Sequence, residues 1–172
     1  MSDPHPPVVL VVGVGNELRG DDGVGVEVAR CVRARLPGDG FEVCELRGHP
    51  TDLLDLWRGR DAVVIVDTMR SGSPPGTILR LDAGNEPLPA RQRNRIGSTH
   101  AAGLAETIEL ARALGALPAR AIVYAVEGCR YDAGAAVTDD LEAIVPKLVE
   151  VVLREARSLR SFDGSVTGFS AR

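Results

Sequence analysis

The chain has 172 residues, of which 44% are hydrophobic and 26% charged, and these values predict one soluble globular domain rather than a disordered chain. The net charge is -4, and its thinly spread positive charge excludes the concentrated basic face that nucleic-acid binding requires. No stretch approaches the roughly 20 apolar residues of a membrane-spanning helix, so we expect neither a nucleic acid nor a membrane as partner.

Five segments carry the pattern of β-strands. Three of them are short runs rich in valine and isoleucine, which is typical of strands buried on both faces. The other two are weaker, and the turn-forming sequence SGSPPG introduces the second of these. In chain order the predicted strands are Val8 to Val12, Phe41 to Leu46, Ala62 to Val66, Thr77 to Leu81 and Ala121 to Val126.

Helical patterns separate most of these strands. Apolar faces at helical spacing cover Val24 to Leu36, Leu104 to Leu114 and Thr138 to Arg157. Pro37 ends the first helix and Gly115 ends the second. The alternation of strands and helices predicts right-handed crossovers and an α/β fold, a three-layer α/β/α sandwich around a mostly parallel, twisted sheet.

The domain organisation follows from the absence of any internal repeat or composition shift. We expect a single domain over residues 1–157. Residues 158–172 are rich in Ser, Gly and Arg and lack periodicity, which predicts a mobile C-terminal tail.

The cysteines and the N-terminus indicate the compartment. Cys31, Cys44 and Cys129 are odd in number and lack metal-binding spacing, which predicts reduced, buried thiols rather than disulfides or a zinc site. The N-terminal MSDPHPP has no basic region followed by an apolar run, as an export signal would. A cytoplasmic location is therefore expected.

The glycine-rich segment GVGNELRGDDGVG, residues 13–25, joins the first predicted strand to the first helix. Such turns lie at the carboxyl edge of a parallel sheet, where ligands bind. Leu18 replaces the third glycine of a dinucleotide-binding loop, and Asp21 and Asp22 would repel a phosphate at the helix N-terminus. The loop therefore favours a cation, with Asp22 as the candidate ligand and Asp21 as a capping or supporting residue.

Two further residues are candidates for the same edge. Asp67 ends the third predicted strand, although an aspartate there also serves simply to begin a turn. His100 follows Gly-Ser-Thr at a predicted helix start, where the helix dipole favours the neutral imidazole that binds metals. The alternative is that His100 is an ordinary surface histidine. Asp22, Asp67 and His100 together offer two oxygens and one nitrogen, a set suited to a divalent transition metal with open positions.

Other catalytic arrangements fit less well. The sequence has neither the G-x-S-x-G elbow of α/β-hydrolases nor the H-E-x-x-H helix of zinc proteases. A triad of Ser98, His100 and Asp67 requires two side chains that are expected to diverge at the helix start.

The motifs GVGNELRGDDGVG, VVIVDTMRSG and GSTHAAGL, in this order, resemble the hydrogenase maturation protease family over about residues 8–153. The resemblance implies a five-stranded sheet between helices and an endopeptidase, aspartic-type or metal-assisted, that removes the C-terminal extension of a nickel-iron hydrogenase large-subunit precursor. It further implies that Asp22, Asp67 and His100 contact the nickel already inserted in that precursor, so no permanent cofactor is expected.

One segment departs from the family pattern. Many members carry a glycine-rich, threonine-containing stretch after the second strand, where this chain has RGHPTDLL, residues 47–54, with Pro50 near an expected glycine. The hydrogenase that is processed therefore stays open. His49 in this segment is interpreted as a turn residue, with a polar contact to substrate as the alternative.

Three questions remain open at the level of sequence. Arg91, Arg93 and Arg95 alternate in a loop-like stretch that we interpret as solvated, with contact to an acidic protein as the alternative. The rival functions are a non-catalytic, nickel-sensing assembly chaperone, a nucleotide-binding protein and, more distantly, a small-molecule hydrolase. A monomer is expected.

Overall fold

The computed structural model describes residues 8–36, 38, 40–91, 93 and 103–161. The strands are β1 (Val9–Val14), β2 (Phe41–Leu46), β3 (Ala62–Met69), β4 (Ile78–Asp82) and β5 (Arg120–Glu127). The helices are α1 (Val24–Arg35), α2 (Leu53–Leu56), α4 (Leu104–Ala113) and α5 (Asp139–Ser161), with short 3-10 helices η1 (Gly20–Gly23) and η2 (Pro50–Asp52).

The strands form one mixed sheet in the order β2-β1-β3-β5-β4, in which only the β4–β5 pair is antiparallel. The predicted mostly parallel, five-stranded sheet is therefore confirmed. Val14 pairs with Leu46 and Gly13 pairs with Val66, so the carboxyl ends of β2, β1 and β3 meet at one edge. This is the edge at which α/β sheets bind ligands.

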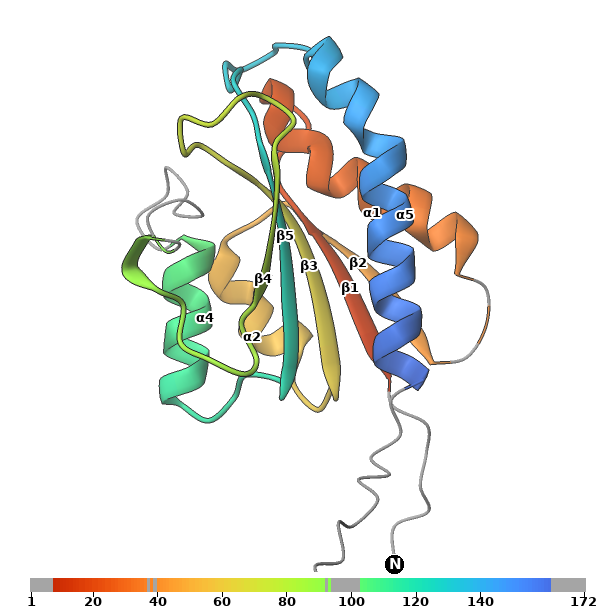
Figure 1. Cartoon of the computed structure of the whole chain (residues 1–172), viewed down its shortest axis with the longest axis vertical. Helices are drawn as coiled ribbons and strands as arrows, with labels where there is room; N and C mark the ends of the chain where they lie inside the picture. The colour runs from red at the N-terminus through yellow and green to blue at the C-terminus, as the bar shows by residue number, and fades with distance from the viewer. Residues whose placement is uncertain (1–7, 37, 39, 92, 94–102, 162–172) are drawn as a thin grey trace, which may run out of the picture.

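Helices cover both faces of the sheet, as Figure 1 shows: α1 and α5 lie on one face and α2 and α4 on the other. Alternate residues of each central strand enter the two cores. Val11 and Val64 pack with α1 and α5, whereas Leu10 and Ile65 pack beneath α2 and α4. Every residue of β1 and β3 is buried, which confirms that these strands are covered on both faces.

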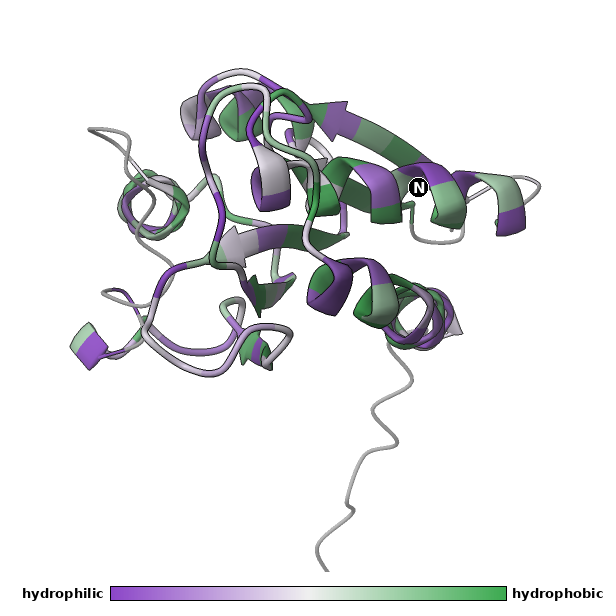
Figure 2. Ribbon diagram, turned by 90° about the horizontal axis from the view of Figure 1, so that it is seen from above, coloured by the Kyte–Doolittle hydropathy of each residue, from purple (hydrophilic) through white to green (hydrophobic). Residues whose placement is uncertain are grey.

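The hydropathy of the ribbon agrees with this layering. Figure 2 shows that hydrophobic and hydrophilic residues alternate around the helices. An amphipathic helix of this kind buries one stripe against a sheet and leaves the other in water. The three-layer α/β/α sandwich predicted from the sequence is therefore the observed architecture.

Three local features differ from the sequence predictions. The segment η2–α2 was not predicted, because its helices are too short to show periodicity, yet it buries Leu53 against the sheet. Strand β3 continues to Met69, so Asp67 lies within the strand rather than at its end. Helix α5 continues to Ser161, past the predicted tail boundary after Arg157, because Leu159 still packs against the core; residues 162–172 lie outside the described part.

The three cysteines differ in their exposure to solvent. Cys31, Cys44 and Cys129 are unpaired, but Cys31 and Cys44 are half-buried and Cys129 is exposed, so the prediction of buried thiols is wrong. Among the residues that the structure describes, no helix is both long and apolar enough to cross a membrane.

Candidate active site

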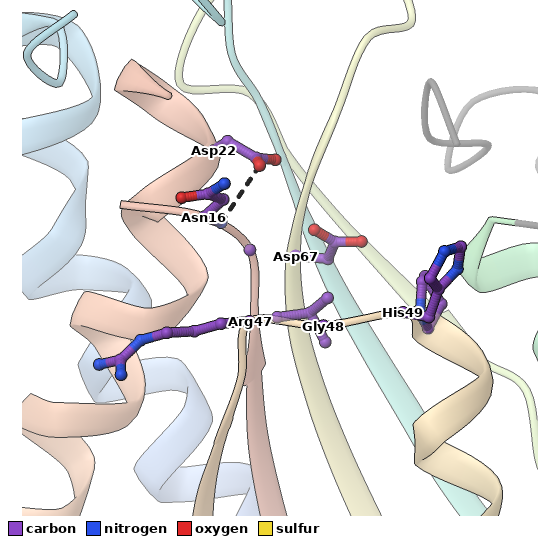
Figure 3. Close-up of a pocket in the computed structure, with 9 residues that line it drawn as sticks. Asn16, Asp22, Arg47, Gly48, His49 and Asp67 are labelled. Atoms are coloured by element: carbon purple, nitrogen blue, oxygen red, sulfur yellow. Dashed lines mark hydrogen bonds between the residues drawn. The ribbon is translucent and has the colours of Figure 1, made fainter. Parts of the chain in front are cut away.

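A pocket of about 240 Å³ lies at the carboxyl edge of the sheet, beside the ends of β1 and β3. Its lining consists of Val14, Gly15, Asn16, Asp22, Arg47, Gly48, His49, Pro50 and Asp67. Figure 3 shows the carboxylates of Asp22 and Asp67 in this pocket, the first from the loop after β1 and the second from β3. The structure thus brings together two of the three candidate residues.

A close turn after β1 positions Asp22. Gly15 has a φ of 142°, and a Cβ on it would lie 1.8 Å from the Asp22 carbonyl oxygen, so glycine is required here. The Asn16 backbone N–H then donates to the Asp22 carbonyl oxygen (3.2 Å) and to its Oδ2 (3.1 Å). The turn therefore holds Asp22 at the mouth of the pocket, where its side chain is half-buried.

The same turn is poorly suited to phosphate. A phosphate loop presents backbone N–H groups to its ligand. Here the Asn16 N–H is taken by the Asp22 carboxylate, whose charge would also repel an anion. The residues therefore favour a cation over a nucleotide.

Asp67 is almost completely buried, with 5% of its surface exposed. Burial raises the pKa of Asp67 to about 8, the Thr68 N–H bonded to its Oδ1 (2.7 Å) opposes this rise, and the nearby Asp22 carboxylate adds to it. A carboxyl with this pKa holds its proton near neutral pH, and a cation that binds Asp67 would displace that proton. In the described part of the chain, the hydrogen-bond donor to the Asp67 carboxyl is the Thr68 N–H, at Oδ1.

Asp21, the neighbour of Asp22, has a structural role, and its side chain is directed toward the β5–α5 loop. It is fully buried, and its carboxylate accepts hydrogen bonds from the backbone N–H groups of Cys129 (2.8 Å), Arg130 (2.9 Å) and Thr138 (2.8 Å) and from the Thr138 hydroxyl (2.9 Å). Burial alone would raise the pKa of Asp21, but these hydrogen bonds outweigh it and lower the pKa. Asp21 therefore anchors the β5–α5 loop and supports the site; it caps neither η1 nor α1.

The third candidate, His100, lies outside the described residues. Within the part of the chain that the structure describes, no three His, Cys, Asp or Glu side chains gather closely enough to hold a metal ion. Asp22 and Asp67 therefore provide two carboxylates in the described part of the pocket, and the place of His100 stays a prediction.

The segment that departs from the family pattern forms one wall of the pocket. Arg47, Gly48, His49 and Pro50 all line it. Figure 3 shows that the Arg47 side chain extends away from the two carboxylates, and it pairs with Glu17 and Glu45 outside the pocket. His49 lies on the opposite side, at the start of η2.

Two of the three alternating arginines, Arg91 and Arg93, lie in the described part of the chain. Arg91 and Arg93 are exposed, as a solvated stretch would be, and neither lines the pocket. Arg95 lies outside the described residues.

Sequence reasoning missed one residue that contacts both acids. Thr68 donates its N–H to Asp67 and its hydroxyl to Asp22 Oδ1 (3.4 Å). Its place directly after Asp67 was the only signal in the sequence, since threonine in a valine-rich run is otherwise an ordinary strand former.

The fold and the pocket define a class: α/β proteins that hold two carboxylates in one pocket at the carboxyl edge of a parallel sheet. The hydrogenase maturation protease family model matches residues 26–155. The chain therefore belongs to this family, and is a peptidase of hydrogenase maturation.

Relatives and solved structures agree with this assignment. The hydrogenase 2 maturation protease of Escherichia coli is 31% identical over 152 residues, which are 87% of this chain and 90% of that protein. The structure of the hydrogenase maturating endopeptidase HybD of Escherichia coli matches with a TM-score of 0.72 and 30% identity, covering 88% of this chain and 93% of the other. The HybD maturation protease of Thermococcus kodakarensis matches with a TM-score of 0.67 and 25% identity, covering 87% and 99%.

Proposed function

We propose that this chain is the endopeptidase that removes the C-terminal extension of a nickel-iron hydrogenase large-subunit precursor once nickel has been inserted. The observation that supports this proposal most directly is the pocket in which Asp22 and Asp67 meet. In the proposal these two residues, together with His100, contact the nickel ion of the precursor. The nickel is then part of the substrate, and the enzyme has no permanent cofactor of its own.

The proposed chemistry begins with recognition of the metal. Carboxylate oxygens and a neutral imidazole suit a divalent transition metal, and binding displaces the proton that buried Asp67 keeps near neutral pH. Contact with the ion fixes the scissile peptide relative to the pocket, which converts recognition into positioning. A precursor without nickel lacks this contact and is left uncut.

Cleavage then needs three events. A water molecule attacks the scissile carbonyl and gives its proton to a base, the carbon–nitrogen bond breaks, and the leaving nitrogen takes up a proton. The metal would assist by polarising the carbonyl, or a carboxylate of the pocket would assist as the base. Both routes use groups that meet in the proposed site.

The proposal includes the setting of the reaction. The partner is the large-subunit precursor, and the enzyme acts as a monomer in the cytoplasm. The three unpaired cysteines are consistent with that reducing compartment.

The test is the mass of the precursor after incubation with the purified chain. We expect loss of a C-terminal peptide from nickel-loaded precursor and no change in nickel-free precursor. Asp22→Asn should abolish the cleavage, whereas Asp55→Asn, the same change at an exposed residue of α2, should not. Stable binding of the precursor with its mass unchanged would instead favour a nickel-sensing chaperone and contradict the proposal.

A further inference from the structure

Thr68 contacts both acidic residues of the pocket. It is 6% exposed, so its contacts are made almost entirely within the protein. Its backbone N–H donates to Asp67 Oδ1 at 2.7 Å, and its hydroxyl donates to Asp22 Oδ1 at 3.4 Å. One buried residue therefore contacts both acids, although Asp22 lies 46 positions away in the chain.

The surroundings fix the position of Thr68. It pairs with Val126 in the centre of the sheet, between β3 and β5. The next carbonyl, that of Met69, accepts a hydrogen bond from the Tyr131 hydroxyl at 3.0 Å, and the Arg70 guanidinium lies 4.7 Å from the centre of the Tyr131 ring. A β-branched side chain on such a strand has few accessible rotamers, so the position of its hydroxyl oxygen is defined, and this hydroxyl contacts both Asp22 and Tyr131.

The type of contact suits a site for a cation. When a cation displaces the Asp67 proton, two like charges lie in one pocket, and hydrogen-bond donors help to keep both carboxylates in place. A hydroxyl supplies a donor without the positive charge of Lys or Arg, which would repel the cation. The contact to Asp22, at 3.4 Å, is longer than the roughly 2.7 to 2.8 Å of an ordinary O–H···O bond, so it orients the carboxylate more weakly than such a bond would.

We propose that Thr68 is a positioning residue that holds Asp22 and Asp67 in the arrangement in which they bind one divalent cation. This inference rests on the proposed function, because it assigns to the two acids a shared ion. Groups that orient metal-binding side chains typically contribute about 10-fold to 100-fold to metal affinity. Because the Thr68–Asp22 contact is long, we expect an effect near the lower end of that range.

The test compares variants that differ only in the hydroxyl. Thr68→Val keeps the branched shape and removes the hydroxyl, and Thr68→Ser keeps the hydroxyl; Thr68→Ala is the matched partner of the serine variant. Ni²⁺ binding to each purified chain is measured by calorimetry, and the melting temperature is recorded as a check on folding. We expect Ni²⁺ affinity to fall about tenfold from threonine to valine and from serine to alanine, with serine close to the wild type.

Each outcome separates this inference from the function on which it rests. Equal affinities within both pairs would overturn the role of Thr68 and leave the proposed function standing. Failure of the wild-type chain to bind Ni²⁺ would overturn the role of Thr68 in a shared cation site, whereas the proposed function is decided separately by cleavage of the nickel-loaded precursor. If the valine variant does not fold, the serine and alanine pair decides the question, because both of its members lack the same methyl group.

Discussion

Asp21 and Asp22 are neighbours with identical side chains, yet their surroundings give them different tasks. Asp21 is fully buried, and its carboxylate accepts hydrogen bonds from the backbone N–H groups of Cys129, Arg130 and Thr138. Asp22 is half-buried and directed into the pocket. The difference arises from a part of the chain that is distant in sequence, since the β5–α5 loop donates hydrogen bonds to the Asp21 carboxylate, whereas the Asp22 carboxylate lines the pocket.

This difference predicts that the same substitution will have a large effect on stability at Asp21 and a small one at Asp22. Asp21→Asn should lower the free energy of unfolding by about 2 to 3 kcal/mol, because an amide NH₂ cannot accept the N–H donors that the carboxylate satisfies. Asp22→Asn should change stability by less than about 1 kcal/mol, since Asp22 is less enclosed. Urea unfolding of the two variants checks this. Equal losses would show that Asp22 is also a structural anchor.

The buried Asp67 predicts a dependence of stability on pH. Its pKa is raised from 3.8 to about 8, so between these values the folded chain keeps a proton that the unfolded chain has released. The unfolded state then binds fewer protons, and this residue makes stability fall as pH rises, by at most about 1.4 kcal/mol per pH unit.

Asp67→Asn removes this effect and is the variant to compare. The free energy of unfolding of the wild type should fall between about pH 5 and about pH 7, whereas the contribution of the asparagine is independent of pH. The variant should therefore become more stable relative to the wild type as the pH rises over this range. Unfolding curves of both chains at several pH values give the difference. A constant difference across this range would mean that Asp67 is ionised in the folded chain.

At the scale of elements, the contact of α1 with the sheet is unusually close. A Cβ on Gly25 would lie 2.3 Å from the Val14 carbonyl oxygen and 2.5 Å from that of Val66. Both oxygens belong to the strands that lead to the pocket. The close packing of α1 on the sheet therefore fixes the distance between η1, which carries Asp22, and the end of β3.

Gly25→Ala tests this packing by the sign of its effect. Helix propensity alone would make the alanine variant more stable by about 1 kcal/mol. The steric conflict with backbone atoms should instead destabilise it, by about 1 to 3 kcal/mol. The midpoint of chemical unfolding distinguishes the two, and a stabilised variant would show that α1 is free to move outward.

Most elements of this fold were predictable because their patterns are long or strongly apolar. The buried runs of β1, β3 and β5 have no other stable environment than a covered sheet. The antiparallel direction of β4 was not predictable, since it depends on the path of the chain after the turn that follows β3. The η2–α2 segment was missed because four helical residues show no periodicity.

The candidate site was predictable only in part, for a related reason. Asp22 and Asp67 each follow a strongly apolar strand pattern, so their common edge could be inferred from the α/β fold. The contact between Thr68 and Asp22 could not be predicted, because it depends on the exact placement of two side chains that are 46 positions apart in the sequence. The role of His100 stays a prediction, since that residue lies outside the described part of the chain.

At the scale of the whole molecule, the pocket predicts which ligands stabilise the chain. Ni²⁺ should raise the melting temperature, because a ligand that binds only the folded state adds to its stability. ATP or NAD should leave it unchanged, because two carboxylates line the pocket and a third is buried behind the same turn. Thermal melts with each ligand check this. Stabilisation by a nucleotide and not by Ni²⁺ would instead support the interpretation of the chain as a nucleotide-binding protein.

The central claim is that Asp22, Asp67 and His100 meet at one divalent ion. Anomalous X-ray diffraction from a crystal of the chain soaked in Ni²⁺ tests it most directly. We expect a nickel peak within bonding distance of both carboxylates and of the His100 imidazole. A peak elsewhere, or a His100 ring remote from the two acids, would contradict it.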